Sequence, residues 1–198
     1  MKGKKLAQLI GVLCVGVCVV LGVFLALNLG DDDGIFSKDE KKPNTEAQNI
    51  LAKNIDRNYP ATVREVVRLY SRISKCYYNE TISEEEFQGL VEMQRKLFDE
   101  EFLENNPLDT FANNLQAEID GAKAREHQIV TWWVQKQSSV VNWKDGENNF
   151  SSIIACYTMN EKGKGYTRTF EEFLLREDEK GHWKIVGWRL TDPIEIED

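Results

Sequence analysis

His127 and His182 are the only two histidines in the sequence. Neither belongs to a Cys-x-x-Cys or His-x-x-x-His pattern, whereas a zinc site needs three or four closely spaced nitrogen or sulfur ligands. The sequence therefore predicts no metal site, and we expect both histidines to lie in turns or at strand ends.

Signatures of catalysis are also absent from the sequence. It contains no Gly-x-Ser-x-Gly nucleophile motif and no Gly-x-x-x-x-Gly-Lys-Ser/Thr phosphate loop. Carboxylates are plentiful, but the runs at 84–86 and 99–101 are typical of helix N-termini and solvated faces. We therefore assign no catalytic and no cofactor-binding residue, which favours a protein that is not an enzyme.

Four aromatic side chains have the chemistry of a ligand cavity, because they combine apolar rings with a polar tip. They are Tyr70, Tyr77, Trp132 and Trp133. The alternative is that they belong to an ordinary core, which we favour because spacing alone does not distinguish the two cases.

Cys76 and Cys156 are the cysteines that lie beyond the apolar N-terminal segment. In an oxidising compartment such a pair can form a disulfide, here between a predicted helix and a predicted strand. Two buried thiols are the other interpretation, and the sequence leaves both open.

Acidic residues dominate the chain after residue 30. All 33 aspartates and glutamates lie in this part of the chain, whereas Lys2, Lys4 and Lys5 lie before it. The whole chain carries a formal net charge of −8. A domain this acidic is repelled by phosphate backbones, so nucleic acid is not expected as a partner.

An apolar segment runs from Leu6 to Leu29 without a charged residue. A helix of this length spans roughly 36 Å at about 1.5 Å per residue, enough for a hydrocarbon core of about 30 Å. Lysines precede the segment and three aspartates (31–33) follow it. Because lysines prefer the cytoplasmic side, residues 6–29 are expected to span the lipid bilayer with the N-terminus inside.

A cleaved signal peptide is the rival interpretation of this segment. Its apolar region would be only about 7–15 residues long, and residues 26–28 match the cleavage site poorly, so we favour the uncleaved anchor. Small residues also recur along one side of the segment, a spacing that lets two membrane helices approach closely, although membrane helices are rich in small residues anyway. This predicted contact stripe consists of Ala7, Gly11, Cys14, Cys18, Gly22 and Ala26.

The rest of the chain is expected to divide into three parts around this anchor. Residues 1–5 form a cytoplasmic stub, residues 30–44 a charged tether, and residues 45–198 an extracytoplasmic domain. Apolar periodicity and capping residues predict helices over 45–58, 62–77, 83–98 and 107–122. Aromatic and β-branched stretches separated by turn residues predict strands over 127–143 (bent near 137–138), 149–159, 166–177 and 183–190.

Helices followed by a strand meander predict an α+β fold, in which the helices pack on a curved antiparallel sheet of about four strands. The last predicted strand, Gly181-His182-Trp183-Lys184-Ile185-Val186-Gly187-Trp188, follows a charged turn. This order and this closing strand resemble the nuclear transport factor 2-like (cystatin-like) superfamily. The resemblance implies a bent sheet wrapped on its helices with a pocket between them. Membrane-tethered members of that superfamily include scaffold subunits of bacterial conjugation and secretion machines.

Two functions follow as hypotheses. The first is a bacterial, single-pass, membrane-anchored scaffold domain outside the cytoplasm, which self-associates or binds another envelope protein. The second is a pocket of the same fold that binds a small ligand or acts as an enzyme.

Overall fold

The computed structural model describes residues 44–196. The predicted stub, membrane helix and contact stripe, and the tether up to residue 43, lie outside these residues. Within the described part of the chain, no helix combines the length and the apolar character needed to cross a bilayer.

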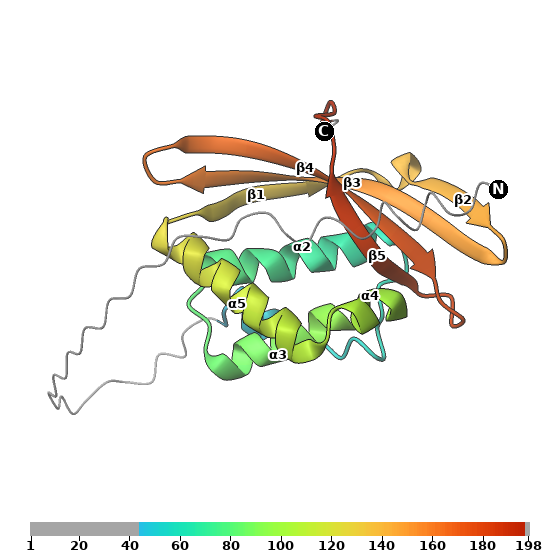
Figure 1. The fold of residues 1–198 in the computed structure, drawn as a ribbon, viewed down its shortest axis with the longest axis horizontal. Helices are drawn as coiled ribbons and strands as arrows, with labels where there is room; N and C mark the ends of the chain where they lie inside the picture. The colour runs from blue at the N-terminus through green and yellow to red at the C-terminus, as the bar shows by residue number, and fades with distance from the viewer. Residues whose placement is uncertain (1–43, 197–198) are drawn as a thin grey trace, which may run out of the picture. The chain divides into compact units, whose positions relative to one another are not determined.

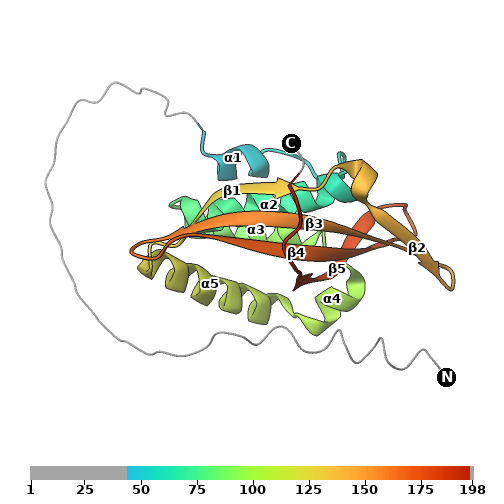
Figure 2. The ribbon, with the colours of Figure 1, turned by 90° about the horizontal axis from the view of Figure 1, so that it is seen from above.

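Five helices cover one face of the sheet (Figures 1 and 2). Four of the helices begin at a residue whose side chain accepts a hydrogen bond from a main-chain N–H group. These N-cap residues are Thr45, Thr62, Ser83 and Asp99. At Ser83 a complete capping box forms with Glu86. The helices are α1 (Glu46–Leu51), α2 (Val63–Asn79), α3 (Glu84–Arg95), α4 (Glu100–Asn105) and α5 (Leu108–Ala124).

Two of the predicted helices end earlier than expected. The first stops at Leu51, and the Asn54 side chain then accepts a hydrogen bond from the Arg57 N–H, a local turn that competes with helix. The third stops at Arg95, because the following residues bond to a distant strand instead: the N–H of Ile185 donates to Leu97 O.

The sheet is antiparallel throughout and has the order β1-β3-β4-β5, with β2 paired to β3 beyond the end of β1. It has five strands rather than about four, since a short 3-10 turn at Gln137–Ser139 divides the first predicted strand in two. This confirms the α+β class with helices on a curved antiparallel sheet. The strands are β1 (Gln128–Val134), β2 (Val141–Asp145), β3 (Asn148–Glu161), β4 (Gly165–Glu177) and β5 (Trp183–Leu190).

The core lies between the helices and the sheet. All six apolar residues predicted to share one face of α2 are buried there. Alternate residues of β3 and β4 meet them, and the Tyr157 hydroxyl of β3 lies 2.8 Å from the Ser71 hydroxyl of α2. The buried residues of α2 on this face are Val63, Val66, Val67, Tyr70, Ile73 and Tyr77.

Aromatic rings occupy the part of this space beneath β4 and β5. Phe173 and Trp188 are paired in the sheet and stack at 5.8 Å, and the Tyr70 ring lies 5.2 Å and 5.3 Å from them. Phe98 and Phe102 continue the cluster, with ring centroids 4.5 Å apart. The five rings pack with one another and join the helices to the last two strands.

The chain after β5 crosses the face of the sheet that the helices leave open (Figures 1 and 2). The Thr191 N–H donates to Phe170 O at 2.9 Å, which ties this segment to β4. Ile194 and Ile196 are half-buried in it. Cys156 and Phe170, which are paired across β3 and β4, are buried on this outer face.

Candidate functional site

An open cleft of about 720 Å³ lies where the β4–β5 turn approaches the start of α4. Four separate segments line it. They are the loop after α1 with Asp56 and Tyr59, the junction of α3 and α4, the start of β3 at Asn148, and the end of the sheet from Arg176 to Lys184. We call this feature the charged cleft, because ionisable side chains of both signs make up most of its wall.

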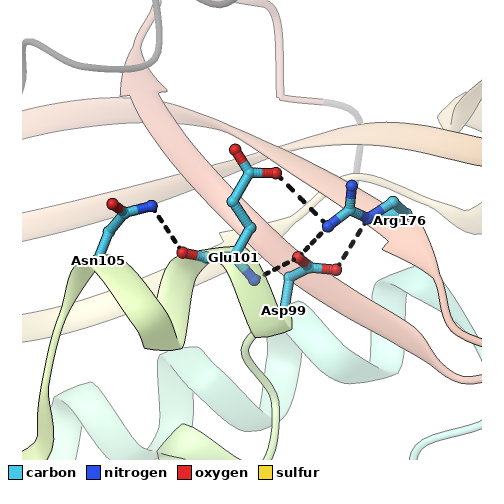
Figure 3. Close-up of polar contacts among 4 residues, drawn as sticks. All are labelled: Asp99, Glu101, Asn105 and Arg176. Carbon is cyan, nitrogen blue, oxygen red and sulfur yellow. Dashed lines mark hydrogen bonds and ion pairs between the residues drawn. The ribbon is translucent and has the colours of Figure 1, made fainter.

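Asp99 and Arg176 form the centre of one wall (Figure 3). Asp99 is 5% exposed, caps α4 by accepting from the Glu101 N–H, and its own N–H donates to Ile185 O at 2.9 Å. Arg176 Nε donates to Asp99 Oδ2 at 3.0 Å, and its Nη2 bonds to Oδ1. These hydrogen bonds raise the pKa of Arg176. The carboxylate and the main-chain N–H of Asp99 thus together join α4, β4 and β5.

Tyr59, His182 and Lys184 form the adjoining part of the wall, since Lys184 and Arg176 are paired across β5 and β4. The Tyr59 ring stacks on His182 at 4.3 Å, and its hydroxyl donates to Trp183 O at 2.9 Å. Lys184 Nζ lies 4.1 Å from the centre of the same ring and donates to Lys96 O at 2.7 Å. Burial lowers the pKa of Lys184. This part of the wall therefore combines an aromatic stack with a partly desolvated cation.

The turn that carries His182 is held by Asp178. Its Oδ1 accepts from the N–H groups of Lys180 and His182, and its Oδ2 lies 3.7 Å from His182 Nδ1. His182 is thus a turn residue, as predicted. Within residues 44–196, no group of three or more His, Cys, Asp or Glu side chains is placed to hold a metal ion.

The four aromatic residues proposed as a pocket lining do not come together. Tyr70 belongs to the aromatic core, and the Tyr77 hydroxyl donates to Gln94 in a separate buried contact. Trp132 and Trp133 are neighbours on β1, so their side chains point to opposite faces of the sheet. Trp132 packs against the core beneath Arg68, and Trp133 pairs with Cys156. None of the four lines the charged cleft.

Cys76 and Cys156 are both free, buried thiols, which is the second of the two interpretations that the sequence left open. Cys76 belongs to α2 and lies in the core beneath the sheet. On β3, the neighbours Ala155 and Tyr157 face that core, so Cys156 points to the outer face. The sheet separates the two sulfur atoms and prevents a bond between them.

A second polar cluster, which the sequence did not reveal, lies beneath β4. Glu171 follows the same alternation as the core residues Phe173 and Leu175, so its carboxyl faces the helices. Burial, and then the charge of Glu118 on α5, raises the pKa of Glu171 to about 7. The Tyr78 hydroxyl of α2 donates to Glu118. Glu171 is half-buried in this cluster, whereas Glu118 is exposed.

Two comparisons with known proteins bear on the family of this chain. A comparison with curated proteins finds no match to this sequence. A family model described as "Domain of unknown function (DUF6715)" matches residues 1–188, which include both the apolar N-terminal segment and the α+β domain as far as Trp188 in β5. The chain therefore belongs to the DUF6715 family.

Proposed function

We propose that this chain is a membrane-anchored interaction domain on the outer side of a bacterial cytoplasmic membrane. Residues 6–29 serve as the single membrane helix in this account. The support is the uncharged apolar run with lysines before it and aspartates after it. The family model also spans this segment together with the domain. The domain then reaches partner proteins in the cell envelope from a short tether.

The nuclear transport factor 2-like architecture is part of the same proposal. Five helices on one face of an antiparallel meander, closed by the strand Trp183–Leu190, support it. Fold does not determine function, because the same scaffold carries many unrelated sites. The proposal therefore depends on the surface of this chain rather than on the resemblance.

One observation favours an interaction domain over a ligand pocket. Beneath β4 and β5 the space between helices and sheet is occupied by the stacked rings of the aromatic core. The charged cleft, in contrast, is open, and in it Tyr59 and Leu103 lie among side chains of both charges. Charged groups of both signs can orient a protein partner and select it by electrostatic complementarity. We therefore place the partner protein in the charged cleft.

The second candidate function is a site for a small molecule beneath the sheet. Glu171 favours it, because a half-buried carboxyl that titrates near neutral pH is typical of catalytic and binding sites. The aromatic packing beside it leaves the interaction domain as the better-supported proposal.

Photocrosslinking in intact cells tests the interaction proposal. A photoreactive phenylalanine analogue replaces Lys180, which lines the charged cleft, in the full-length protein. We expect ultraviolet light to produce one discrete protein adduct, whose identity is read from the crosslinked peptide. A second copy of this chain and another envelope protein are both supporting results.

The matched control carries the same analogue at Lys162, an exposed lysine in the β3–β4 turn. This turn joins the end of β3 to the start of β4, whereas the start of β3 and the end of β4 line the cleft. Equal adducts at both positions, or no protein adduct at position 180, would contradict a partner in the charged cleft.

A further inference from the structure

The strand β2 forms a free edge of the sheet. It pairs with β3 on one side, beyond the end of β1, and the helices stop short of it (Figures 1 and 2). Within residues 44–196, no other segment forms a hydrogen bond with the main chain on its second side. All five residues of β2 are exposed. An edge of this kind is a template for pairing with another strand.

The β2–β3 turn determines which main-chain groups point to this edge. It is a two-residue turn in which Gly146 has a φ of 62°, and the strand residues on either side of such a turn form a hydrogen-bonded pair. Hydrogen-bonded and non-hydrogen-bonded pairs alternate, so Trp143 and Phe150 also form a hydrogen-bonded pair. The N–H and C=O groups of Asn142 and Lys144 therefore point away from β3, to the free edge.

The same strand exposes two large apolar side chains. Val141 is 60% exposed and Trp143 is 42% exposed, and alternation places both on one face of β2. The Trp143 ring stacks on Phe150 of β3, with ring centroids 5.8 Å apart. Neither Val141 nor Trp143 lines the charged cleft. Apolar side chains beside an unpaired edge indicate a surface that another strand covers.

We propose that β2 pairs with β2 of a second copy of this chain, antiparallel and edge to edge, in a register centred on Asn142. In this register the Asn142 N–H of each copy donates to the Asn142 C=O of the other. Val141 of each copy lies opposite Trp143 of the other, in a non-hydrogen-bonded pair, where side chains approach most closely. The sheets of the two copies then form one continuous sheet.

The sequence of β2 itself argues for a second copy as the occupant. The covering strand must place an apolar residue opposite each of the two exposed side chains, and β2 does so because Val141 and Trp143 face each other twice about a two-fold axis. Charge also permits the contact. Lys144 and Asp145 cancel within β2, whereas the whole chain carries a net charge of −8. Two acidic domains therefore meet at a neutral strand, where repulsion is small.

Disulfide trapping in intact cells tests this pairing. Asn142→Cys is made in a full-length protein in which Cys14 and Cys18 are replaced by alanine, since Cys76 and Cys156 are buried. In the proposed register, the two Cα atoms at position 142 lie about 5.5 Å apart, within the range of a disulfide. A membrane-permeable oxidant should therefore produce a disulfide-linked dimer of this chain, whichever side of the membrane holds the domain.

The matched control is Glu147→Cys in the same protein. Glu147 is another exposed residue of this hairpin, but it lies in the turn. In the proposed pair the two copies of this position are on the order of 30 Å apart. The control should therefore give no dimer above the background of the parent protein.

A second change tests the apolar contact. Val141→Glu, added to Asn142→Cys, should lower the initial rate of dimer formation roughly tenfold, because it places a charge against Trp143 of the second copy. Since Val141 is exposed, the fold should stay intact, which tryptophan fluorescence checks. No dimer in Asn142→Cys, a disulfide to a different protein, an equal dimer in Glu147→Cys, or an unchanged rate with Val141→Glu would overturn the pairing.

Discussion

Replacement of Phe173 by alanine should lower the free energy of unfolding of the domain by about 3–5 kcal/mol. The Phe173 side chain is fully buried, and its ring contacts those of Tyr70 and Trp188. Its removal leaves a cavity at the point where α2 meets β4 and β5, and the surrounding rings have little freedom to fill it. Urea titration of the full-length protein measures the loss, with the five tryptophans, all in this domain, as fluorescent probes.

Tyr166→Ala provides the matched control for this prediction. Tyr166 is another aromatic residue of β4, but it is 72% exposed. Its truncation should change stability by no more than about 0.5 kcal/mol. Similar losses in the two variants would show that the aromatic core does not have the role we assign to it.

Arg176→Met should destabilise the domain by about 3 kcal/mol, because the change leaves the Asp99 carboxylate buried without its cation. Asp99 also caps α4 and bonds to β5 through its main chain, so we expect the wall of the charged cleft to loosen together with α4. Urea titration gives the stability, and hydrogen exchange of α4 reports the local effect.

The comparison variant is Arg189→Met. This change also removes an arginine that pairs with a carboxylate at the sheet, but the Arg189 side chain is 67% exposed. Exposed ion pairs contribute about 0–1 kcal/mol. An equally small loss in Arg176→Met would mean that the Asp99 pair acts as an ordinary surface contact.

The parts of the fold that the sequence predicted depend on local signals. The apolar face of α2 repeats every three to four residues, and the Ser83–Glu86 box marks the start of α3, so both elements are recognisable from their own residues. Turn residues at Asp145-Gly146 and Lys180-Gly181 likewise separate strands that the structure contains. The sequence predicts a helix at Leu97 and Phe98, whereas the structure pairs these residues with Ile185. Local signals do not reveal this partner, because it is far away in the sequence.

The charged cleft could not be predicted, because it is assembled from distant segments. Tyr59 and Trp183, joined by one hydrogen bond, are 124 positions apart. Asp99 and Arg176 are 77 positions apart, and each resembles an ordinary surface charge in its own segment. No periodicity connects such residues, so only the folded chain places them together.

Glu171 and Cys156, in contrast, were within reach of sequence reasoning. Glu171 stands two positions before Phe173 and four before Leu175, so alternation places a carboxylate on the apolar side of β4. The same alternation, once Tyr157 is assigned to the core, sends Cys156 to the opposite face. The sequence alone does not show which face of each strand packs against the helices.

The location of the domain is the central claim, and chemical labelling of intact cells tests it most directly. The full-length Lys162→Cys variant is changed in the β3–β4 turn, away from the charged cleft, and carries one exposed thiol in the described part of the chain, since Cys76 and Cys156 are buried. A membrane-impermeant maleimide should label this variant as completely in intact cells as in lysed cells. Protoplasts replace intact cells where a cell wall blocks the reagent. The unmodified protein gives the background labelling. Labelling that appears only after lysis would place the domain inside the cytoplasm and contradict the account.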